Sequence, residues 1–257
     1  LVLLGFLYAR EFDTNPVFFE LDKTDLKIKN KYGAVLWSWV VHQNVGEQLN
    51  IDELKTRIRI IDVNNDGENE VLASGEFIYS KDVNARKYFY CFNSGREELW
   101  RVTILDTVSS PKERNIPADY SVQIYDMFKI DGKMRLLLGA NSAPTYPAVL
   151  FTIDPVTGKR FSGTLWNAGF IFQVGFADIN SDGKRDIVFI ASDNGLKLLK
   201  IVAVEFPLKD GMLETRPDYF LYGKNRLEPL LEISLKSTDF IQDHTHFERD
   251  YFVSRTL

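Results

Sequence analysis

Asp62-Val-Asn-Asn-Asp-Gly-Glu-Asn-Glu70 is a nine-residue segment whose pattern recurs as Asp178-Ile-Asn-Ser-Asp-Gly-Lys-Arg-Asp186. Both copies place oxygen-bearing side chains at positions 1, 3, 5 and 9 and a glycine at position 6. Hard cations such as Ca²⁺ bind several oxygen ligands on a loop that a glycine lets turn sharply. Turns rich in Asn, Asp and Gly also form for purely local reasons, but two copies with the same spacing favour metal binding.

Each copy supplies four side-chain ligands and one main-chain ligand. We predict Ca²⁺ at two structural sites, one formed by Asp62, Asn64, Asp66, Glu70 and the carbonyl of Glu68, the other by Asp178, Asn180, Asp182, Asp186 and the carbonyl of Lys184. Position 12, Ala73 or Phe189, cannot supply the bidentate glutamate of an EF-hand. The flanking segments are short and rich in β-branched or aromatic residues, so each loop is predicted to connect two strands.

A third copy of the register, at residues 125–139, lacks the ligands. Aligning Asp131-Gly132 with Asp66-Gly67 places Met127, Lys129 and Arg135 where the other copies have Asp, Asn and an acid. We expect this copy to keep the turn and the apolar strand that follows it, and to hold no ion. The repeating element is therefore an architectural unit in which calcium is optional.

A second repeat is in register with the first. A glycine turn followed by a strand ending in Leu-Trp occurs at Trp37, Trp100 and Trp166, which lie 63 and 66 residues apart. The Asp-Gly pairs lie 65 and 51 residues apart. Periods of this length, each holding several short strands, are typical of propeller blades. The sequence predicts an all-β propeller with four to five blades of three or four antiparallel strands.

The Asp-x-Asn-x-Asp-Gly-x-x-Asp/Glu loop between two strands resembles the integrin-type FG-GAP or VCBS repeat. Two loops carry the resemblance, within a blade pattern that covers about residues 17–204; the third departs at every side-chain ligand except Asp131. The resemblance implies a β-propeller with Ca²⁺ in the inter-strand loops. It also implies extracytoplasmic binding or adhesion, with a protein or glycan ligand, in place of catalysis.

The chain is expected to comprise an apolar segment, residues 1–15, and a propeller domain, residues 16–257. Residues 1–9 are too few to span a membrane, which takes about 20, so they are either the tail of an anchor that tethers the protein or a strand that closes the propeller. The inner strand of the first blade is expected to be missing or to come from elsewhere. The expected strands and blades are residues 16–22, 25–29 and 35–39 for the first blade, 55–103, 121–168 and 170–222 for the next three, and 229–235 for a further strand.

Length and composition limit the range of possible functions. A chain of 257 residues that is 45% apolar can bury a sizeable core. Its net charge of -5, without a cluster of basic residues, gives no support for a nucleic-acid partner. The single cysteine, Cys91, cannot form an intrachain disulfide and is expected to be a buried small side chain. Weak calcium loops fill where free calcium is abundant, which favours an extracytoplasmic location.

Little else in the sequence suggests chemistry. His244 and His246 can face one side of a strand and share a transition-metal ion, but without a third ligand a solvent-facing pair is expected. Residues 107–117 and 140–147 are candidate ligand-binding loops, although plain blade connections are the favoured interpretation of both. We therefore predict a non-enzymatic binding, sensor or adhesion module of a larger membrane-associated protein. The alternatives are a scaffold subunit that mediates assembly, and a propeller enzyme of the carbohydrate-active or quinoprotein-like kind.

Overall fold

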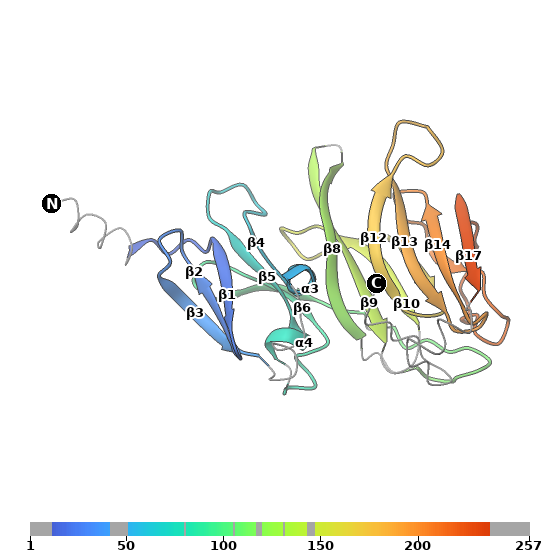
Figure 1. Ribbon diagram of the computed structural model, residues 1–257, viewed down its shortest axis with the longest axis horizontal. Coiled ribbons are helices and arrows are strands. Elements are labelled where there is room, and N and C mark those ends of the chain that lie inside the picture. Colours follow the sequence, from blue (N-terminus) through green and yellow to red (C-terminus); the bar gives the residue numbers. More distant parts are fainter. Residues whose placement is uncertain are drawn as a thin grey trace.

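The computed structural model describes residues 12–41, 51–79, 81–104, 106–116, 120–130, 132–142 and 147–236. These residues form an all-β fold of four sheets. The sheets follow one another in chain order along the long axis of the molecule (Figure 1). Within the described residues no sheet closes on itself. The segment 1–11, the histidines at 244 and 246 and the end of the predicted propeller domain lie outside this part of the chain.

The first sheet has three antiparallel strands, in the order β1 (Phe18–Asp22), β2 (Asp25–Lys29) and β3 (Val35–Val40). The three predicted strands are confirmed. Phe19, Ile28 and Trp37 pair across the three strands on one face. Because side chains alternate along a strand, this apolar set faces the next sheet and the charged set faces outward.

The second sheet is a four-stranded antiparallel meander within the predicted second blade. Its strands are β4 (Ile58–Ile61), β5 (Glu70–Ser74), β6 (Phe89–Phe92) and β7 (Glu98–Val102). Two short helices accompany it, α3 (Ile51–Arg57) and α4 (Gly75–Ile78). The second blade was expected to begin at residue 55, and α3 begins before that position. Arg57 joins the two helices, because its guanidinium lies 3.0 Å from the carboxylate of Glu76.

The third sheet corresponds to the third predicted blade and gains two strands from elsewhere. Its antiparallel strands are β8 (Tyr120–Ile130), β9 (Lys133–Ser142), β10 (Ala148–Ile153) and β11 (Arg160–Asn167). Beyond β11 lie β15 (Gly211–Leu213) and β16 (Arg226–Leu227), both parallel to their neighbours. Gly211 permits this approach, because a Cβ there would lie 2.6 Å from the carbonyl oxygen of Asn225.

The fourth sheet differs from the predicted fourth blade in its last strand. It contains β12 (Ile171–Ala177), β13 (Asp186–Asp193), β14 (Leu198–Val204) and β17 (Leu231–Lys236). The predicted end of this blade, residue 222, is therefore wrong. The segment between β14 and β17 leaves the fourth sheet to extend the third, and the strand expected near residues 229–235 completes the fourth.

The hydrophobic core consists of three clusters, one between each pair of consecutive sheets. The first cluster joins Ile28 of β2 to Tyr90 of β6. The second joins Trp100 of β7 to Trp166 of β11, and the third joins Leu150 of β10 to Phe189 of β13. The sheets therefore pack face to face, as neighbouring blades do in a propeller.

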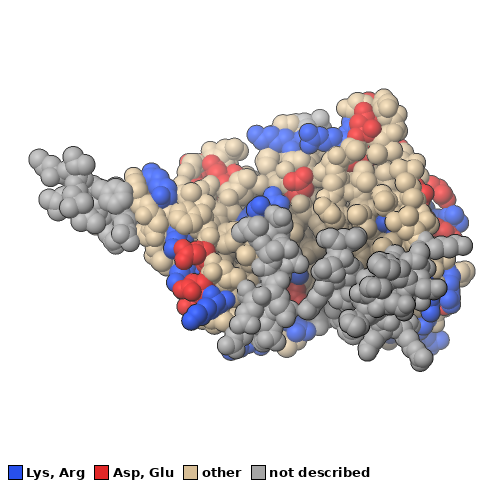
Figure 2. All heavy atoms as spheres, viewed as in Figure 1, with Lys and Arg blue, Asp and Glu red and all other residues tan. Residues whose placement is uncertain are grey.

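The two outermost faces of this stack differ in chemistry. The outer face of the first sheet carries ion pairs, Lys27 with Asp22 and Lys29 with Glu20. Figure 2 shows basic and acidic atoms interspersed over this sheet. The outer face of the fourth sheet carries exposed aliphatic side chains on its edge strand, Leu231, Ile233 and Leu235. A charged face gives no hydrophobic gain on burial, so these two faces are poor partners for each other.

Each repeated tryptophan lies in the last strand of its meander, Trp37 in β3, Trp100 in β7 and Trp166 in β11. The turn before each strand is closed by an Asx residue, Asn30, Asn93 or Asp154, whose carbonyl accepts an N–H from three or four residues further on. The predicted turn before each tryptophan strand is thus confirmed, but β3, β7 and β11 continue past the tryptophan instead of ending at it. No helix in the described residues is both long and apolar enough to span a bilayer.

Candidate metal-binding loops

The two acidic loops occupy equivalent places in two sheets. Residues 62–69 join β4 to β5 and residues 178–185 join β12 to β13, the first two strands of each meander. The ladders end at the loops, with Ile61 paired to Glu70 and Ala177 paired to Asp186. The predicted strand-to-strand connection is confirmed. Both loops and the β8–β9 hairpin lie along the same edge of the molecule (Figure 1).

In the first loop, side-chain oxygens accept main-chain N–H groups. Asp62 accepts from Asp66 at 3.2 Å through Oδ1 and from Gly67 at 2.9 Å through Oδ2. Asn64 Oδ1 accepts from the N–H of Asp66 at 2.9 Å. Asp66 Oδ1 accepts from the N–H of Glu68 at 2.8 Å. The residue at position 1 therefore holds the whole turn against the end of β4.

The second loop repeats these bonds position by position. Asp178 accepts from Asp182 at 3.0 Å through Oδ1 and from Gly183 at 2.9 Å through Oδ2. Asn180 Oδ1 accepts from the N–H of Asp182 at 3.0 Å. Asp182 Oδ1 accepts from the N–H of Lys184 at 2.8 Å, and this bond, followed by the charge of Lys184, lowers the pKa of Asp182. The sequence repeat is therefore a repeat of structure.

The backbone explains the glycine at position 6. Gly67 and Gly183 have φ values of 93° and 82°. In this left-handed region a Cβ is strained, so glycine is the residue that turns the chain here without cost. Position 4 is also left-handed, with φ values of 62° at Asn65 and 59° at Ser181. Asn tolerates this conformation better than Ser does.

Position 9 of each loop carries a buried carboxylate at the start of a strand. Glu70 is 3% exposed and Asp186 is 2% exposed. Glu70 Oε2 accepts the N–H of Val63 at 2.9 Å, and Asp186 Oδ2 accepts the N–H of Ile179 at 3.0 Å. Burial raises the pKa of Glu70, the Val63 N–H opposes this, and the neighbouring loop carboxylates raise it further. A cation placed beside Glu70 would therefore be favourable.

Three predicted ligands of the first loop lie close together. Asn64 Nδ2 donates to Asp66 Oδ2 at 2.8 Å and approaches Glu70 Oε1 at 3.3 Å, so a hydrogen-bond donor lies between two carboxylates. All three side chains converge on this point, and they are predicted ligands. Among the described residues, no group of three or more His, Cys, Asp or Glu side chains is gathered as a metal centre. Ion binding thus requires the loop carboxylates to draw closer together.

The side chain at position 7 of each loop, Glu68 or Lys184, has a contact of its own. Glu68 accepts a hydrogen bond from Ser94 Oγ at 2.8 Å. Lys184 Nζ lies 3.6 Å from Asp182 Oδ2 and partly neutralises the second loop. At position 7 the expected ligand is the main-chain carbonyl of Glu68 or Lys184 and not the side chain, and that expectation stays a prediction.

The motifs are the only link to a known family. No protein-family model, curated protein or solved structure matched this chain. The resemblance to FG-GAP or VCBS repeats therefore rests on the two loops and on their place between strands.

The third copy of the register is a short connection in place of a loop. β8 continues to Ile130 and β9 begins at Lys133, so Lys129 and Arg135 lie within strands. Gly132 keeps the left-handed conformation, with φ of 74°. The expected turn and the apolar strand after it are confirmed; Asp131 lies outside the described residues.

The other sequence candidates differ in outcome. Cys91 of β6 is fully buried, as expected, and burial raises the pKa of its thiol. The connection after β7 packs against the segment that follows β15: the N–H of Lys112 donates to the carbonyl of Asp218, and that of Tyr222 to the carbonyl of Ser109, both at 2.8 Å. Together they border an open hollow of about 500 Å³. The candidate loop at residues 140–147 is described only in part.

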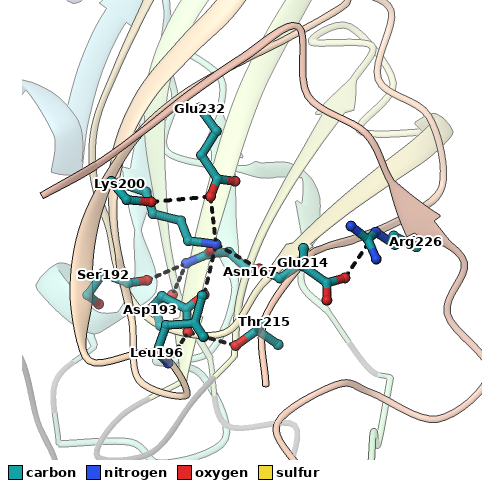
Figure 3. A network of polar contacts seen from close by, with 11 residues as sticks. Asn167, Ser192, Asp193, Leu196, Lys200, Glu214, Thr215, Arg226 and Glu232 are labelled. Atoms are coloured by element: carbon teal, nitrogen blue, oxygen red, sulfur yellow. Dashed lines mark hydrogen bonds and ion pairs between the residues drawn. The ribbon is translucent and has the colours of Figure 1, made fainter. Parts of the chain in front are cut away.

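A buried ion pair fixes the same segment to the fourth sheet (Figure 3). Lys200 of β14 is fully buried, and its Nζ lies 3.0 Å from Asp193 Oδ2 and 3.3 Å from Glu232 Oε1. It also donates to the carbonyl of Glu214 at 2.7 Å. Asp193 Oδ1 accepts from the hydroxyl of Thr215 at 2.7 Å. No sequence signal marked these residues, because they come together only when β13, β14, β17 and the inserted segment pack.

Proposed function

We propose that the chain is a Ca²⁺-stabilised binding module built from propeller-type blades, located outside the cytoplasm and without catalytic activity of its own. The observation that carries this proposal is the matching hydrogen-bond network of the two loops, each of which ends on a buried carboxylate. The face-to-face packing of consecutive sheets supports the propeller part. The unmatched outer faces favour a ring with more blades than these four sheets.

The ions would be structural. In each loop, Asp62 or Asp178 holds the turn while the carboxylate at position 9 begins the next strand. A bound Ca²⁺ would neutralise these carboxylates and fix the loop between its two strands. Loops held rigidly along one edge of a scaffold are suited to present a binding surface to a protein or glycan ligand.

Calorimetric titration of the full chain with Ca²⁺ tests the proposal. We expect two equivalents to bind, one equivalent after Asp62→Ala with Asp66→Ala, and one after Asp178→Ala with Asp182→Ala. Asn69→Ala is the matched control, because Asn69 lies in the first loop but contacts Pro16 and Asn15. Unchanged stoichiometry in both double variants would refute the metal assignment.

The scaffold alternative is favoured by one observation, the aliphatic outer face of the fourth sheet. Ile233 is 44% exposed and Leu235 47%, beside the half-buried Ile190 and Ile201. Where a sheet lies inside the stack, a neighbouring sheet covers such a face. A second copy of this chain could cover the outer face of the fourth sheet in the same way. Sedimentation of the wild type and of Ile233→Lys at equal concentration tests this role, since only the wild type should then associate.

A further inference from the structure

A pocket of about 290 Å³ lies at the loop-bearing edge, lined by residues 63–65, the β8–β9 hairpin and the connection from β10 to β11. Of the predicted calcium ligands, only Asn64 is among the residues that line it. Its lining combines basic, amide and apolar groups, among them Asn65, Lys129, Lys133, Arg135, Asp154 and Phe161. At this size, the pocket can hold a ligand of about one sugar ring or a comparable small group.

The charge of the pocket is positive. Among the described residues that line it, three are cationic and one, Asp154, is acidic, and no ion pair joins any of the three cations to a described acidic residue. The Asp154 carboxylate is engaged, because its Oδ1 accepts the N–H of Val156 at 2.9 Å. Figure 2 shows a row of Lys and Arg atoms above the tip of β8. Since the whole chain has a net charge of -5, this concentration is local.

The guanidinium of Arg135 is held in place by an aromatic ring. Its guanidinium carbon lies 3.3 Å from the centroid of the Phe161 ring, which fixes the plane of the group. Its Nη1 is buried and has no hydrogen-bond partner. A buried guanidinium N–H without an acceptor is unfavourable, and an oxyanion would satisfy it.

The repeat explains why cations gather here. Lys129 and Arg135 occupy positions 3 and 9 of the calcium-loop register, the positions of Asn64 and Glu70 in the first loop. Positions that carry an amide and a carboxylate in the two loops therefore carry cations in the third sheet. Shortening the loop to a two-residue connection brings these side chains onto the paired strands β8 and β9.

We propose that this pocket binds an acidic sugar unit through its carboxylate or sulfate group. Arg135 and the two lysines bind the oxyanion, the Asn65 amide is available to the hydroxyls, and Phe161 and Met134 contribute apolar surface for the ring. The inference deepens the proposed binding function by naming its ligand class. It does not require calcium to be bound.

Binding of small sugars to the full chain tests the inference. The probes are trigalacturonate, a sulfated disaccharide and neutral maltotriose, each titrated with and without Ca²⁺. We expect saturable binding of at least one anionic sugar at a single site, weakened by added salt, and no binding of maltotriose. The preferred anionic probe identifies the oxyanion as carboxylate or sulfate.

Variants separate recognition from general charge attraction. Arg135→Lys keeps the charge but loses the planar group, so we expect about tenfold weaker binding. Lys129→Ala should also weaken binding. Lys209→Ala removes one positive charge at an exposed ion pair with Glu205, outside the pocket, and should leave the affinity unchanged. Thermal melting of each variant checks that it is folded.

Three results would overturn the inference: equal binding of maltotriose, unsaturable binding, or equal affinities for wild type, Arg135→Lys and Lys129→Ala. Unchanged calcium stoichiometry in both loop double variants, with binding of the anionic sugar to the wild type intact, would refute the calcium proposal alone. The two proposals therefore fail separately.

Discussion

Glu70 is the residue of the first loop whose pKa is shifted by its surroundings. Its pKa is raised by burial, against the Val63 N–H, with Asp66 and Asp62 adding to the shift. A raised pKa in the folded state means that folding favours the protonated form. The ionised carboxylate therefore lowers stability at neutral pH in the absence of a cation, and this cost fades as the pH falls through the folded pKa.

Glu70→Gln should have opposite effects with and without calcium. In chelator the glutamine keeps an acceptor for the Val63 N–H and removes the unfavourable charge, so the melting temperature should rise by about 2 °C. With saturating Ca²⁺ the variant lacks a ligand and should melt below the wild type. Scanning calorimetry at pH 7 under both conditions measures the difference, and melting shifts of the same sign in both would contradict the assignment.

Calcium affinity should also depend on pH. Because Ca²⁺ requires the ionised carboxylate, affinity for the first loop should weaken as the pH falls through the raised pKa of Glu70. Titration of the Asp178→Ala, Asp182→Ala variant between pH 7 and pH 4 isolates this site. An affinity that is constant over the whole interval would argue against a role for Glu70 as a ligand.

At the scale of elements, the turns before the tryptophan strands determine how sheets approach each other. Gly158 has φ of 69°, and a Cβ on it would lie 2.8 Å from the ring of Trp100 in the neighbouring sheet. The same indole donates its N–H to the carbonyl of Pro155 at 3.0 Å. Gly33 has φ of 80° in the corresponding turn of the first sheet, and a Cβ on it would meet nothing within 4 Å.

Gly158→Ala should therefore cost more than Gly33→Ala. Both substitutions introduce left-handed strain of about 1–2 kcal/mol, and only the first also displaces Trp100. We expect urea unfolding to give a free-energy loss for Gly158→Ala that exceeds the loss for Gly33→Ala by about 1 kcal/mol or more. Equal losses would show that the turn and the indole are not closely packed in solution.

The Lys200 ion pair links β14, β13 and the segment after β15. Lys200→Met leaves Asp193 buried without its cation, which typically costs about 3–5 kcal/mol. Lys200→Met with Asp193→Asn should recover part of this loss, because Asn keeps the acceptor for the Thr215 hydroxyl. Urea unfolding of both variants tests the coupling. A double variant no more stable than Lys200→Met would indicate that the pair is not coupled.

At the scale of the whole molecule, the described residues form a stack of four sheets in which each outer sheet packs against one other sheet. Stability therefore accumulates through sheet-to-sheet contacts, and both candidate metal-binding loops lie at strand junctions next to such contacts. Each ion bound at a hundred times its dissociation constant adds about 2.7 kcal/mol to the folded state. The Glu70→Gln variant and the Ala variants of the loops would change this ion-dependent part of the free energy of unfolding.

Chelation should accordingly lower the melting temperature of the wild type by several degrees. With about 2–4 °C per kcal/mol for a chain of this length, removal of two ions at this saturation corresponds to about 10–20 °C. Differential scanning calorimetry in EDTA and in excess Ca²⁺ makes the comparison. An unchanged melting temperature would mean that the loops are ordinary Asx turns.

Local patterns determined most of the strands. Alternation and β-branched residues located β1, β2 and β3 within two residues and predicted a strand on each side of both loops, and the Asx-Gly motif located both loops between strands. These features depend on neighbours in sequence: a left-handed glycine and a carboxylate that accepts the next N–H groups act within one turn. For the same reason the repeat length predicted the units of the stack.

Long-range packing decided the rest. The sequence did not show that the segment after β14 joins the third sheet, because β15 and β16 are short and gain their hydrogen bonds only from β11 and each other. Two further contacts likewise depend on strands that are distant or oppositely directed in the chain. They are the ion pairs of Lys200 with Asp193 and Glu232, and the stacking of Arg135 on Phe161. Burial and partner identity are properties of the packed sheets, so only the tertiary structure determined the buried ion pair and the basic pocket.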